Sequence, residues 1–225
     1  LQEPLRKIMA FGDRLATKYQ HELEGPGNDY IIRMQSAAAR MQSLIEDLLA
    51  YSRVSRNVNA FEPLDMDLLL AEVIDDLESQ VRRERAVIQV AKLPAIRGDR
   101  MQVKRLFQNL LSNAIKFHKP GVDPVVSIQG NVTRSTEISD EYGITLSGNQ
   151  YICFSILDNG IGFDEKYADK VFHIFQRLHG RSEYEGTGIG LSICRKIVTN
   201  HGGFITARSK ENDGAEFIVI LPVEL

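Results

Sequence analysis

The stretch Asp158-Asn159-Gly160-Ile161-Gly162-Phe163 organises the chain, because it directly follows the apolar run at residues 151–157. That run is typical of a buried strand, so Asp158 comes at a strand end and the glycines predict a tight turn after it. A carboxylate there can accept a hydrogen bond from an exocyclic amine such as that of adenine, and glycine lets a ligand approach the backbone closely. Taken alone, the same spacing also fits an ordinary bend after a strand.

A second glycine cluster, Gly186-Thr187-Gly188-Ile189-Gly190-Leu191, precedes an apolar-periodic segment that predicts a helix from residue 191 to 198. Backbone N–H groups at a helix start, together with the positive end of the helix dipole, suit a phosphate chain. We therefore expect the two glycine clusters to hold opposite ends of one nucleotide.

Length and composition set limits on the class of protein. The chain has 225 residues and 43% hydrophobic content, enough to bury one full core and to hold two units. Its net charge of −3 argues against a nucleic-acid partner. Cys153 and Cys194 fit small buried hydrophobes, in keeping with a reducing, cytoplasmic setting. No apolar run approaches the roughly 18 residues that span a bilayer, so we expect no direct membrane insertion.

Two helical seams open the chain. Apolar residues recur at alternating steps of four and three over residues 1–19, within a helix expected to reach about residue 24, and again over residues 31–48. The helix-breaking cluster at residues 25–29 separates them, so we expect a long antiparallel helical hairpin. Each stripe is wide enough to touch more than one neighbour. The simplest way to bury these stripes is a homodimer that forms a four-helix bundle. The alternative is a hairpin packed on the rest of its own chain.

The helical pattern fades near residue 60, so we divide the chain into a hairpin domain at residues 1–58 and a second domain at residues 61–225. The fold class is therefore α+β, with the helical hairpin followed by a domain of mixed helices and strands. Pro4 either interrupts the first helix or occupies its first turn. In the second domain we expect helices at 66–83 and 100–117, and Asp99 is expected to cap the second of them. We expect strands at 61–65, 86–91, 96–99, 125–132, 150–157, 204–208 and 215–221. A polar connection is expected at 133–149.

The helix predicted at residues 100–117 carries Asn109 and Asn113 four residues apart, and so on one face, with Lys116 close to that face. Asparagine is a mediocre helix former, so two of them in register call for an explanation. An amide oxygen can ligate Mg²⁺ without adding charge, and a lysine one turn later can meet a phosphate. The alternative is a polar face turned to solvent.

Four segments, taken in order, resemble the N, G1, F and G2 boxes of sensor histidine kinases. They are N-L-L-S-N-A-I-K-F at 109–117, D-N-G-I-G-F at 158–163, V-F-H-I-F at 171–175 and G-T-G-I-G-L at 186–191. The leading hairpin resembles the dimerisation and phosphotransfer domain of the family, and the L-Q-E-P-L-R-K sequence at 1–7 is most similar to kinases of the phytochrome-associated kind.

The resemblance implies an α/β sandwich of the kind shared with gyrase, Hsp90 and MutL, with ATP and Mg²⁺ as ligands. It also implies transfer of the γ-phosphoryl group to a histidine and then to an aspartate of a response regulator receiver domain, under an upstream sensor domain. We further hypothesise that the second domain swings about the linker near residue 60 to reach a histidine on the bundle, within one subunit or across the dimer.

By position, the resemblance makes Asn113 the Mg²⁺ ligand, places Lys116 on phosphate and Asp158 on the adenine amine, and adds Asn109 to the catalytic set. A lid is expected at 171–177, tethered by Phe172 and Phe175, in which Arg177 or Arg181 either assists or is plain surface. The other residues implied at the nucleotide site are Phe117, Gly160, Gly162, Phe163, Gly186, Thr187, Gly188, Gly190 and Leu191.

Two departures from the family pattern matter. The phosphoacceptor histidine of the family precedes the segment that matches residues 1–5, and none of the five histidines here sits at that place, so we expect the acceptor upstream of Leu1 in a longer protein. Glu3 stands where many relatives carry Thr or Asn to orient a water, which puts phosphatase activity in doubt.

Two rival functions stay open. One is an ATPase of the gyrase, Hsp90 or MutL type, which would carry a glutamate base where this helix has Asn109. The other is a pseudokinase that uses the hairpin only as a scaffold for dimerisation and signal relay.

Overall fold

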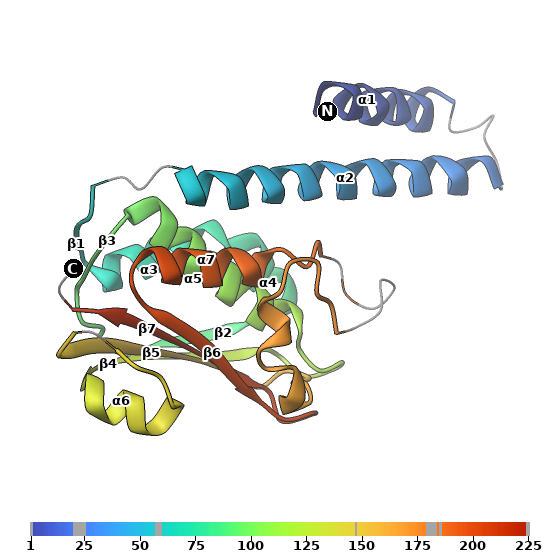
Figure 1. Ribbon diagram of the computed structural model, residues 1–225. Coiled ribbons are helices and arrows are strands. Elements are labelled where there is room, and N and C mark those ends of the chain that lie inside the picture. Colours follow the sequence, from blue (N-terminus) through green and yellow to red (C-terminus); the bar gives the residue numbers. More distant parts are fainter. Residues whose placement is uncertain are drawn as a thin grey trace.

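The computed structural model describes residues 2–19, 26–56, 60–146, 148–178, 184 and 186–223. Two helices, α1 (Gln2–Lys18) and α2 (Pro26–Arg56), run antiparallel as the expected hairpin (Figure 1). The first helix is shorter than expected, because it ends at Lys18 and not near residue 24. Pro4 lies in its first turn and interrupts nothing, since a first-turn residue has no intrahelical N–H bond to lose. The predicted turn residue Gly25 lies outside the described residues.

The hairpin buries only part of its apolar surface. Leu5 and Gly12 of α1 and Ile31 and Ala38 of α2 are buried, and a Cβ added to Gly12 would lie 2.8 Å from Cγ of Gln35. The two helices therefore touch closely along one stripe. Further large apolar side chains of the described hairpin residues are 39–70% exposed, namely Ile8, Phe11, Leu15, Tyr19, Tyr30, Ile32, Met34, Met41, Leu48 and Leu49.

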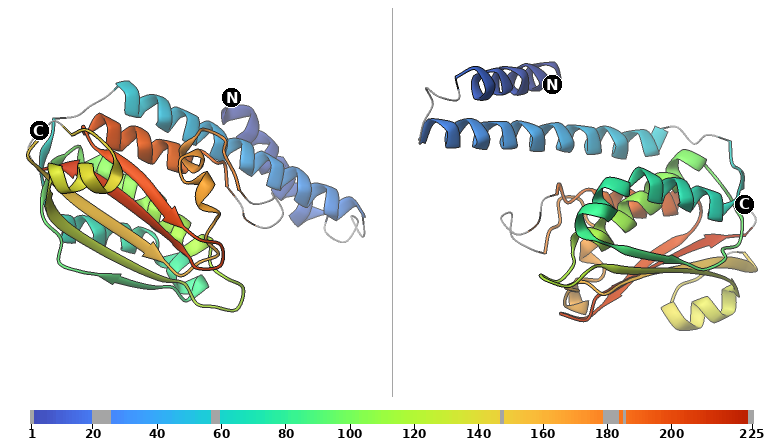
Figure 2. Two further views of the ribbon diagram at one scale, coloured as in Figure 1. Left: turned by 60° about the horizontal axis from the view of Figure 1, so that its bottom comes forward. Right: turned by 180° about the vertical axis from the view of Figure 1, so that it is seen from behind.

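A five-stranded sheet with the order β2-β4-β5-β7-β6 forms the body of the rest of the chain; β2 runs parallel to β4, and the other neighbours are antiparallel. Helices α3, α5 and α7 cover one face of the sheet, and α2 lies across them on the outside (Figures 1 and 2). A two-stranded sheet pairs β1 with β3.

The bounds of these helices and strands are β1 Glu62–Leu64, α3 Met66–Asp76, α4 Glu78–Glu84, β2 Val87–Val90, β3 Ile96–Gly98, α5 Arg100–Lys116, β4 Val125–Arg134, β5 Gln150–Asp158, α7 Gly190–Asn200, β6 Phe204–Ser209 and β7 Ala215–Pro222, with short 3-10 helices at Glu165–Tyr167 and Lys170–Phe172.

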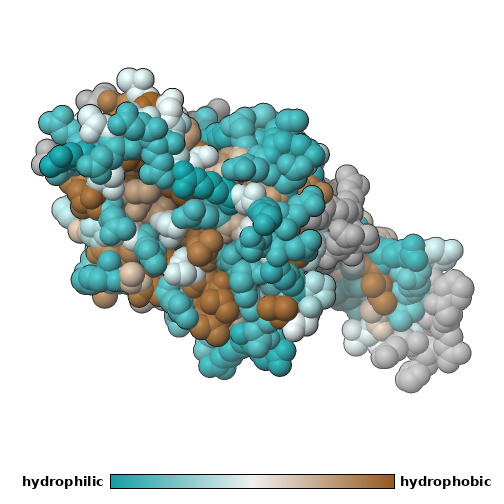
Figure 3. Space-filling model, turned by 90° about the horizontal axis from the view of Figure 1, so that it is seen from below, coloured by the Kyte–Doolittle hydropathy of each residue, from teal (hydrophilic) through white to brown (hydrophobic). Residues whose placement is uncertain are grey.

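Two expectations for this part of the chain were wrong in detail. The helix predicted at 66–83 is two helices, α3 and α4, because the chain turns at Leu77, whose N–H contacts three preceding carbonyls. The polar connection expected at 133–149 contains helix α6 (Ser135–Tyr142). It lies on the sheet face opposite the other helices and buries Ile138 against a small cluster around Tyr151 (Figure 2). Seen from below, the molecule shows a mostly hydrophilic surface with hydrophobic patches (Figure 3).

The predicted cap of α5 is confirmed: Oδ1 of Asp99 accepts hydrogen bonds from the N–H groups of Met101 and Gln102 at 3.0 and 3.2 Å. A buried histidine also fixes the start of α5. His201 Nε2 accepts from the N–H of Asp99 at 3.1 Å, so the ring proton is on Nδ1, which donates to the carbonyl of Ile197 at 2.8 Å. Phe61 stacks on the imidazole at a centroid distance of 4.7 Å.

The buried imidazole makes stability depend on pH. Burial lowers the pKa of His201 from its ordinary value near 6.5, because the folded protein disfavours the charged ring. The stability from the neutral ring is present above that value and is lost as the pH falls through the folded pKa. The buried carboxyl of Asp158, whose pKa burial raises to about 6, shifts stability in the opposite direction over the same range, so wild type and His201→Gln have to be compared. As the pH falls from about 7.5 to about 5.5, we expect the urea unfolding midpoint of the wild type to drop relative to that of His201→Gln. A constant difference between the two proteins would rule out the ring as the source.

Candidate nucleotide-binding site

A cavity of about 280 Å³ opens between α5, the end of β5 and the second glycine cluster. It brings together segments that are far apart in the chain, as the two-cluster interpretation requires. The predicted residues that line it are Asn109, Asn113, Lys116, Phe117, Asp158, Gly162, Phe163, Gly186, Thr187, Gly188, Gly190 and Leu191.

Asp158 closes the inner end of the cavity and is 9% exposed. Its Oδ1 accepts hydrogen bonds from the N–H groups of Gly160 at 2.8 Å and Ala215 at 3.2 Å. Burial raises the pKa of Asp158 to about 6, and the two backbone hydrogen bonds oppose that shift. Both recorded bonds go to Oδ1, so Oδ2 is placed to accept from a ligand amine.

Gly160 does not line the cavity, contrary to the prediction. A Cβ there would lie 2.3 Å from the carbonyl oxygen of Phe117, which also accepts from the N–H of Ile161 at 2.9 Å. Glycine is therefore required because the turn packs against the end of α5, not because a ligand approaches it. Gly160 thus shapes this end of the cavity only through the packing of the turn.

One face of α5 supplies the polar side chains, as predicted. Asn109, Asn113 and Lys116 all face the cavity, and the Nδ2 atom of Asn109 is buried without a hydrogen-bond partner among the described residues. Nζ of Lys116 lies 4.2 Å from the centre of the Phe117 ring and within 3.1 Å of the place a Cβ on Gly186 would take. The lysine thus reaches from α5 to the second glycine cluster.

The amide groups of α5 fit a magnesium ion held jointly with a ligand. Among the described residues there is no cluster of three His, Cys, Asp or Glu side chains that could bind a metal unaided. Mg²⁺ usually keeps only one or two protein ligands and completes its shell with substrate phosphates and water. The oxygen of Asn113 beside a triphosphate is such a donor set.

The opposite end of the cavity is the start of α7. Gly188 has φ +74°, and a Cβ there would lie 2.9 Å from the carbonyl oxygen of Gln176, so only glycine fits. Ile189 donates its N–H to Oγ1 of Thr187 at 3.3 Å, and α7 has no side-chain cap. A helix start of this kind is suited to an anion.

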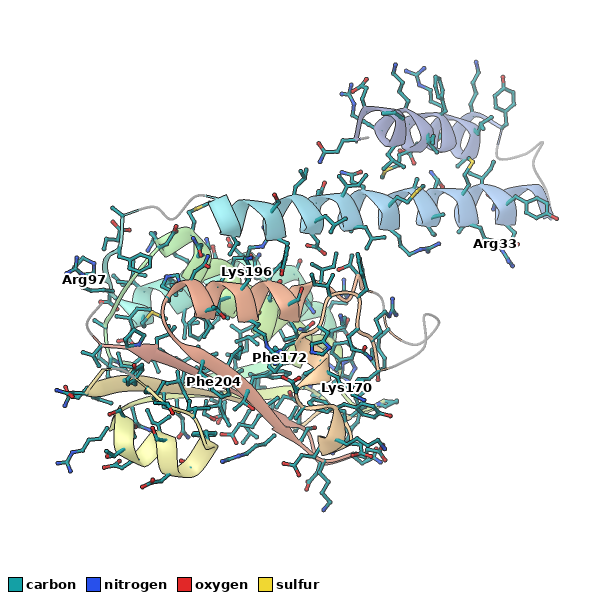
Figure 4. The ribbon with its side chains drawn as sticks, viewed as in Figure 1. Arg33, Arg97, Lys170, Phe172, Lys196 and Phe204 are labelled. Carbon is teal, nitrogen blue, oxygen red and sulfur yellow. The ribbon has the colours of Figure 1, made fainter. Side chains whose placement is uncertain are left out.

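The lid prediction was half wrong. Phe172, labelled in Figure 4, is buried at 2% exposure. It packs edge-on against Phe217 at a centroid distance of 6.2 Å, so it does tether the segment. Phe175 is 58% exposed, has a left-handed φ of +64° and donates its N–H to the carbonyl of Gly188. That backbone bond, and not an apolar contact, ties residue 175 to the glycine cluster. Phe175 is therefore not a core tether.

Arg177 lines the cavity and fixes the segment after the lid patch. Its guanidinium donates to the carbonyls of Gly186 at 2.5 Å and Tyr184 at 2.7 Å. The plain-surface interpretation of Arg177 is therefore wrong, while Arg181 lies outside the described residues.

Several residues that line the cavity had not been predicted, and two of them, Tyr184 and Asp47, make hydrogen bonds across it. The Tyr184 hydroxyl donates to the carbonyl of His118 at 3.1 Å, and its ring meets Phe117 at 5.1 Å. Its place just before the second glycine cluster was a usable signal. Asp47 comes from α2 in the hairpin, 140 residues before Thr187, and no pattern in the sequence links it to the site.

With this geometry established, comparison with known proteins shows which family the chain belongs to. The sequence profile of the family described as "Histidine kinase-, DNA gyrase B-, and HSP90-like ATPase" matches residues 98–225. The chain belongs to this family. The α+β fold expected from the sequence is confirmed. The matched residues 98–225 of this ATPase family member include every residue that lines the cavity except Asp47.

Relatives place this ATPase family member with the sensor histidine kinases, which confirms the resemblance. Cyanobacterial phytochrome A of Nostoc sp. (strain PCC 7120 / SAG 25.82 / UTEX 2576) is 36% identical over 223 residues, 99% of this chain and 27% of the relative. The methanogenesis regulatory histidine kinase FilI of Methanothrix harundinacea (strain 6Ac) is 31% identical over 190 residues, 84% of this chain and 20% of the relative. The chain spans about a quarter or less of the length of these curated relatives.

A solved structure extends the likeness to the hairpin. The crystal structure of histidine kinase ThkA in complex with response regulator protein TrrA has a TM-score of 0.64 and 20% sequence identity, and the match covers 98% of this chain and 59% of that chain. At this identity the likeness shows the fold alone. Over the residues that the structure describes, no helix has the length and apolar character needed to cross a bilayer.

Proposed function

We propose that this chain is the kinase core of a sensor histidine kinase. It binds ATP with Mg²⁺ and transfers the γ-phosphoryl group to a histidine nitrogen, from which the group passes to an aspartate of a response regulator. One observation carries the proposal: Asp158, the amide face of α5 and the second glycine cluster all line a single cavity. The family membership of residues 98–225 supports ATP as the nucleotide.

Each end of the cavity has a proposed role. Asp158 accepts from the adenine amine, Phe117 flanks the base, and Gly162 and Phe163 shape this end. The N–H groups at the start of α7, with Thr187, Gly188, Gly190 and Leu191, receive the phosphates. Magnesium, held by Asn113 with Asn109 close by, would neutralise charge on the phosphates as the P–O bond breaks and the P–N bond forms.

Lys116 stabilises charge from the α5 side, where its ammonium group points toward the second glycine cluster. Neutral imidazole is already a nucleophile, so the protein mainly has to position the reactants. In this proposal the acceptor histidine precedes Leu1. His118, His173 and His201 all lie in the nucleotide-binding part, and His21 and His179 fall outside the described residues. Glu3 on α1 is exposed and paired with Arg6, 2.9 Å away, which gives no support to a hydrolytic role.

The hairpin is proposed as a dimerisation and phosphotransfer domain at residues 1–58, and the nucleotide-binding domain as residues 61–225. The apolar side chains that the hairpin leaves exposed support a homodimer through a four-helix bundle. The partner named for ThkA supports a response regulator receiver domain as the second partner. An upstream sensor domain and a cytoplasmic location complete the proposal, with no role for nucleic acid.

The rival functions are less well supported. A gyrase-type ATPase needs a carboxylate base, and the corresponding place on α5 holds Asn109, whose amide cannot take a proton from water. A scaffold would not need a cavity lined by two asparagines, a lysine and a buried carboxylate.

Incubation with γ-labelled ATP and Mg²⁺ of the protein carrying its natural residues upstream of Leu1 tests the proposal. We expect acid-labile, base-stable phosphate on the protein, as a phosphohistidine requires. Asn113→Ala should lower the rate of labelling on the order of 100-fold, because a group that holds charge in place at the reacting phosphate is lost. Asn131→Ala, at an exposed position of β4, is the matched control. Acid-stable label, or equal rates in the two variants, would refute the kinase assignment.

A further inference from the structure

The hairpin helix α2 contributes one carboxylate to the nucleotide cavity. Oδ2 of Asp47 accepts a hydrogen bond from Oγ1 of Thr187 at 2.6 Å, and Oδ1 lies 3.4 Å from Nη2 of Arg105. The side chain of Asp47 is 27% exposed and lines the cavity together with Asn109 and Lys116. The negative charge of this carboxylate would repel a triphosphate at the proposed phosphate end.

We propose that Asp47 is a latch that holds the nucleotide-binding part against α2 while the phosphate end is free of ligand, and that Mg²⁺-ATP releases it. This inference rests on the proposed function of the same cavity. Thr187 donates its hydroxyl hydrogen to Asp47 in the latched arrangement, so the same donor is not available to a phosphate oxygen. Any phosphate at the start of α7 also meets the negative charge of Asp47 within a cavity where water screens poorly.

The remaining contacts of α2 with the nucleotide-binding part fit an interface that opens. Asn200 donates to the carbonyl of Val54 at 2.6 Å, and Nζ of Lys196 lies 5.1 Å from the centre of the Tyr51 ring, on the side of α7 that faces α2 (Figure 4). Among the described residues, α2 packs on this part through its C-terminal half: Ala50 and Val54 are buried, and Leu44 and Tyr51 are partly buried against the same core.

The latched arrangement is also imperfect. Nε of Arg105 is buried with no hydrogen-bond partner among the described residues, although Nη2 of the same guanidinium reaches Asp47. A buried donor left without a partner opposes the arrangement that buries it. Among the contacts that the described residues of α2 make with the nucleotide-binding part, those of Asp47 lie at the cavity itself.

In this proposal Asp47 and the nucleotide phosphates compete for the start of α7, and interactions that compete weaken each other equally. Removing the latch should therefore strengthen nucleotide binding. We expect Asp47→Asn to bind the non-hydrolysable analogue AMPPNP with Mg²⁺ roughly 5- to 20-fold more tightly than the wild type, by isothermal titration calorimetry. Glu46→Gln is the matched control, because it removes the same charge one residue away on the exposed face of α2, where Glu46 contacts only Gln42 among the described residues. Its affinity should equal that of the wild type.

Hydrogen exchange over residues 44–54 supplies a second readout. In the wild type we expect AMPPNP to speed exchange there, whereas in Asp47→Asn exchange should already be fast without nucleotide. Weaker binding by Asp47→Asn would overturn the latch, since it would mean that the carboxylate helps to hold the ligand or its ion. Equal affinities would overturn it too. If the wild type itself binds no nucleotide, the proposed function fails and the latch fails with it.

Discussion

Asp158→Asn is expected to reduce the affinity for ATP by roughly 30- to 160-fold, which corresponds to about 2–3 kcal/mol for a hydrogen bond to a charged group. The asparagine oxygen can still accept from the N–H groups of Gly160 and Ala215. Its NH₂ group would then face the adenine amine, so two donors would meet where a donor and an acceptor met before. Calorimetric titration with AMPPNP and Mg²⁺ at about pH 8, well above the Asp158 pKa of about 6, measures the loss.

The same variant has a built-in control for folding. Burial raises the pKa of Asp158 from 3.8 to about 6, so the stability this group contributes is greatest below 3.8 and is lost as the pH rises through 6. A neutral amide removes the cost of burying the ionised form. At about pH 8 we therefore expect a Tm for Asp158→Asn equal to or above that of the wild type. A weaker affinity accompanied by a large drop in Tm would show damage to the fold and not a lost adenine contact.

Gly162→Ala should destabilise the protein on the order of 3–5 kcal/mol, the range of severe core changes. Gly162 has φ +59°, a conformation that side chains disfavour, and an added Cβ would lie 2.0 Å from the carbonyl oxygen of Lys210 and 2.7 Å from that of Gly214. Both atoms belong to backbone, so neither can rotate away as a side chain would. Urea unfolding followed by circular dichroism measures the change.

Gly143→Ala separates the clash from the conformational cost. Gly143 has a similar φ of +65°, but no atom of the described residues lies within 4 Å of the place its Cβ would take. We expect a loss of about 1–2 kcal/mol from the left-handed backbone alone. Equal losses in the two variants would contradict the view that the Gly162 turn is closed by its neighbours.

The sequence was a good guide wherever local pattern and ligand chemistry agree. The strand ending at Asp158, the cap at Asp99 and the asparagine face of α5 each follow from a short stretch with its own physical logic, and all are confirmed as structure. Their roles toward a nucleotide stay predictions. The family profile over residues 98–225 supports the same interpretation by a route that does not depend on geometry.

Features set by distant parts of the chain could not be predicted. Helix α6 has few apolar residues of its own and forms where Ile138 can cover the cluster around Tyr151 on the outer face of the sheet. Phe175 is exposed and is tied to Gly188 through its backbone N–H, a contact that no hydrophobic pattern reveals. Asp47 reaches the cavity only because α2 lies across α7, an arrangement that no local stretch encodes.

The two ends of the cavity are built in different ways. At the inner end, backbone joins backbone: Ile161 bonds to the Phe117 carbonyl and Asn159 to that of Val125. At the outer end, the side chains of Arg177 and Asp47 hold the glycine cluster. An inhibitor confined to the inner end would therefore meet one fixed shape whatever α2 does. A longer compound reaching the start of α7 would meet Asp47 in the proposed latched arrangement and not in the released one, so its affinity would differ between the two.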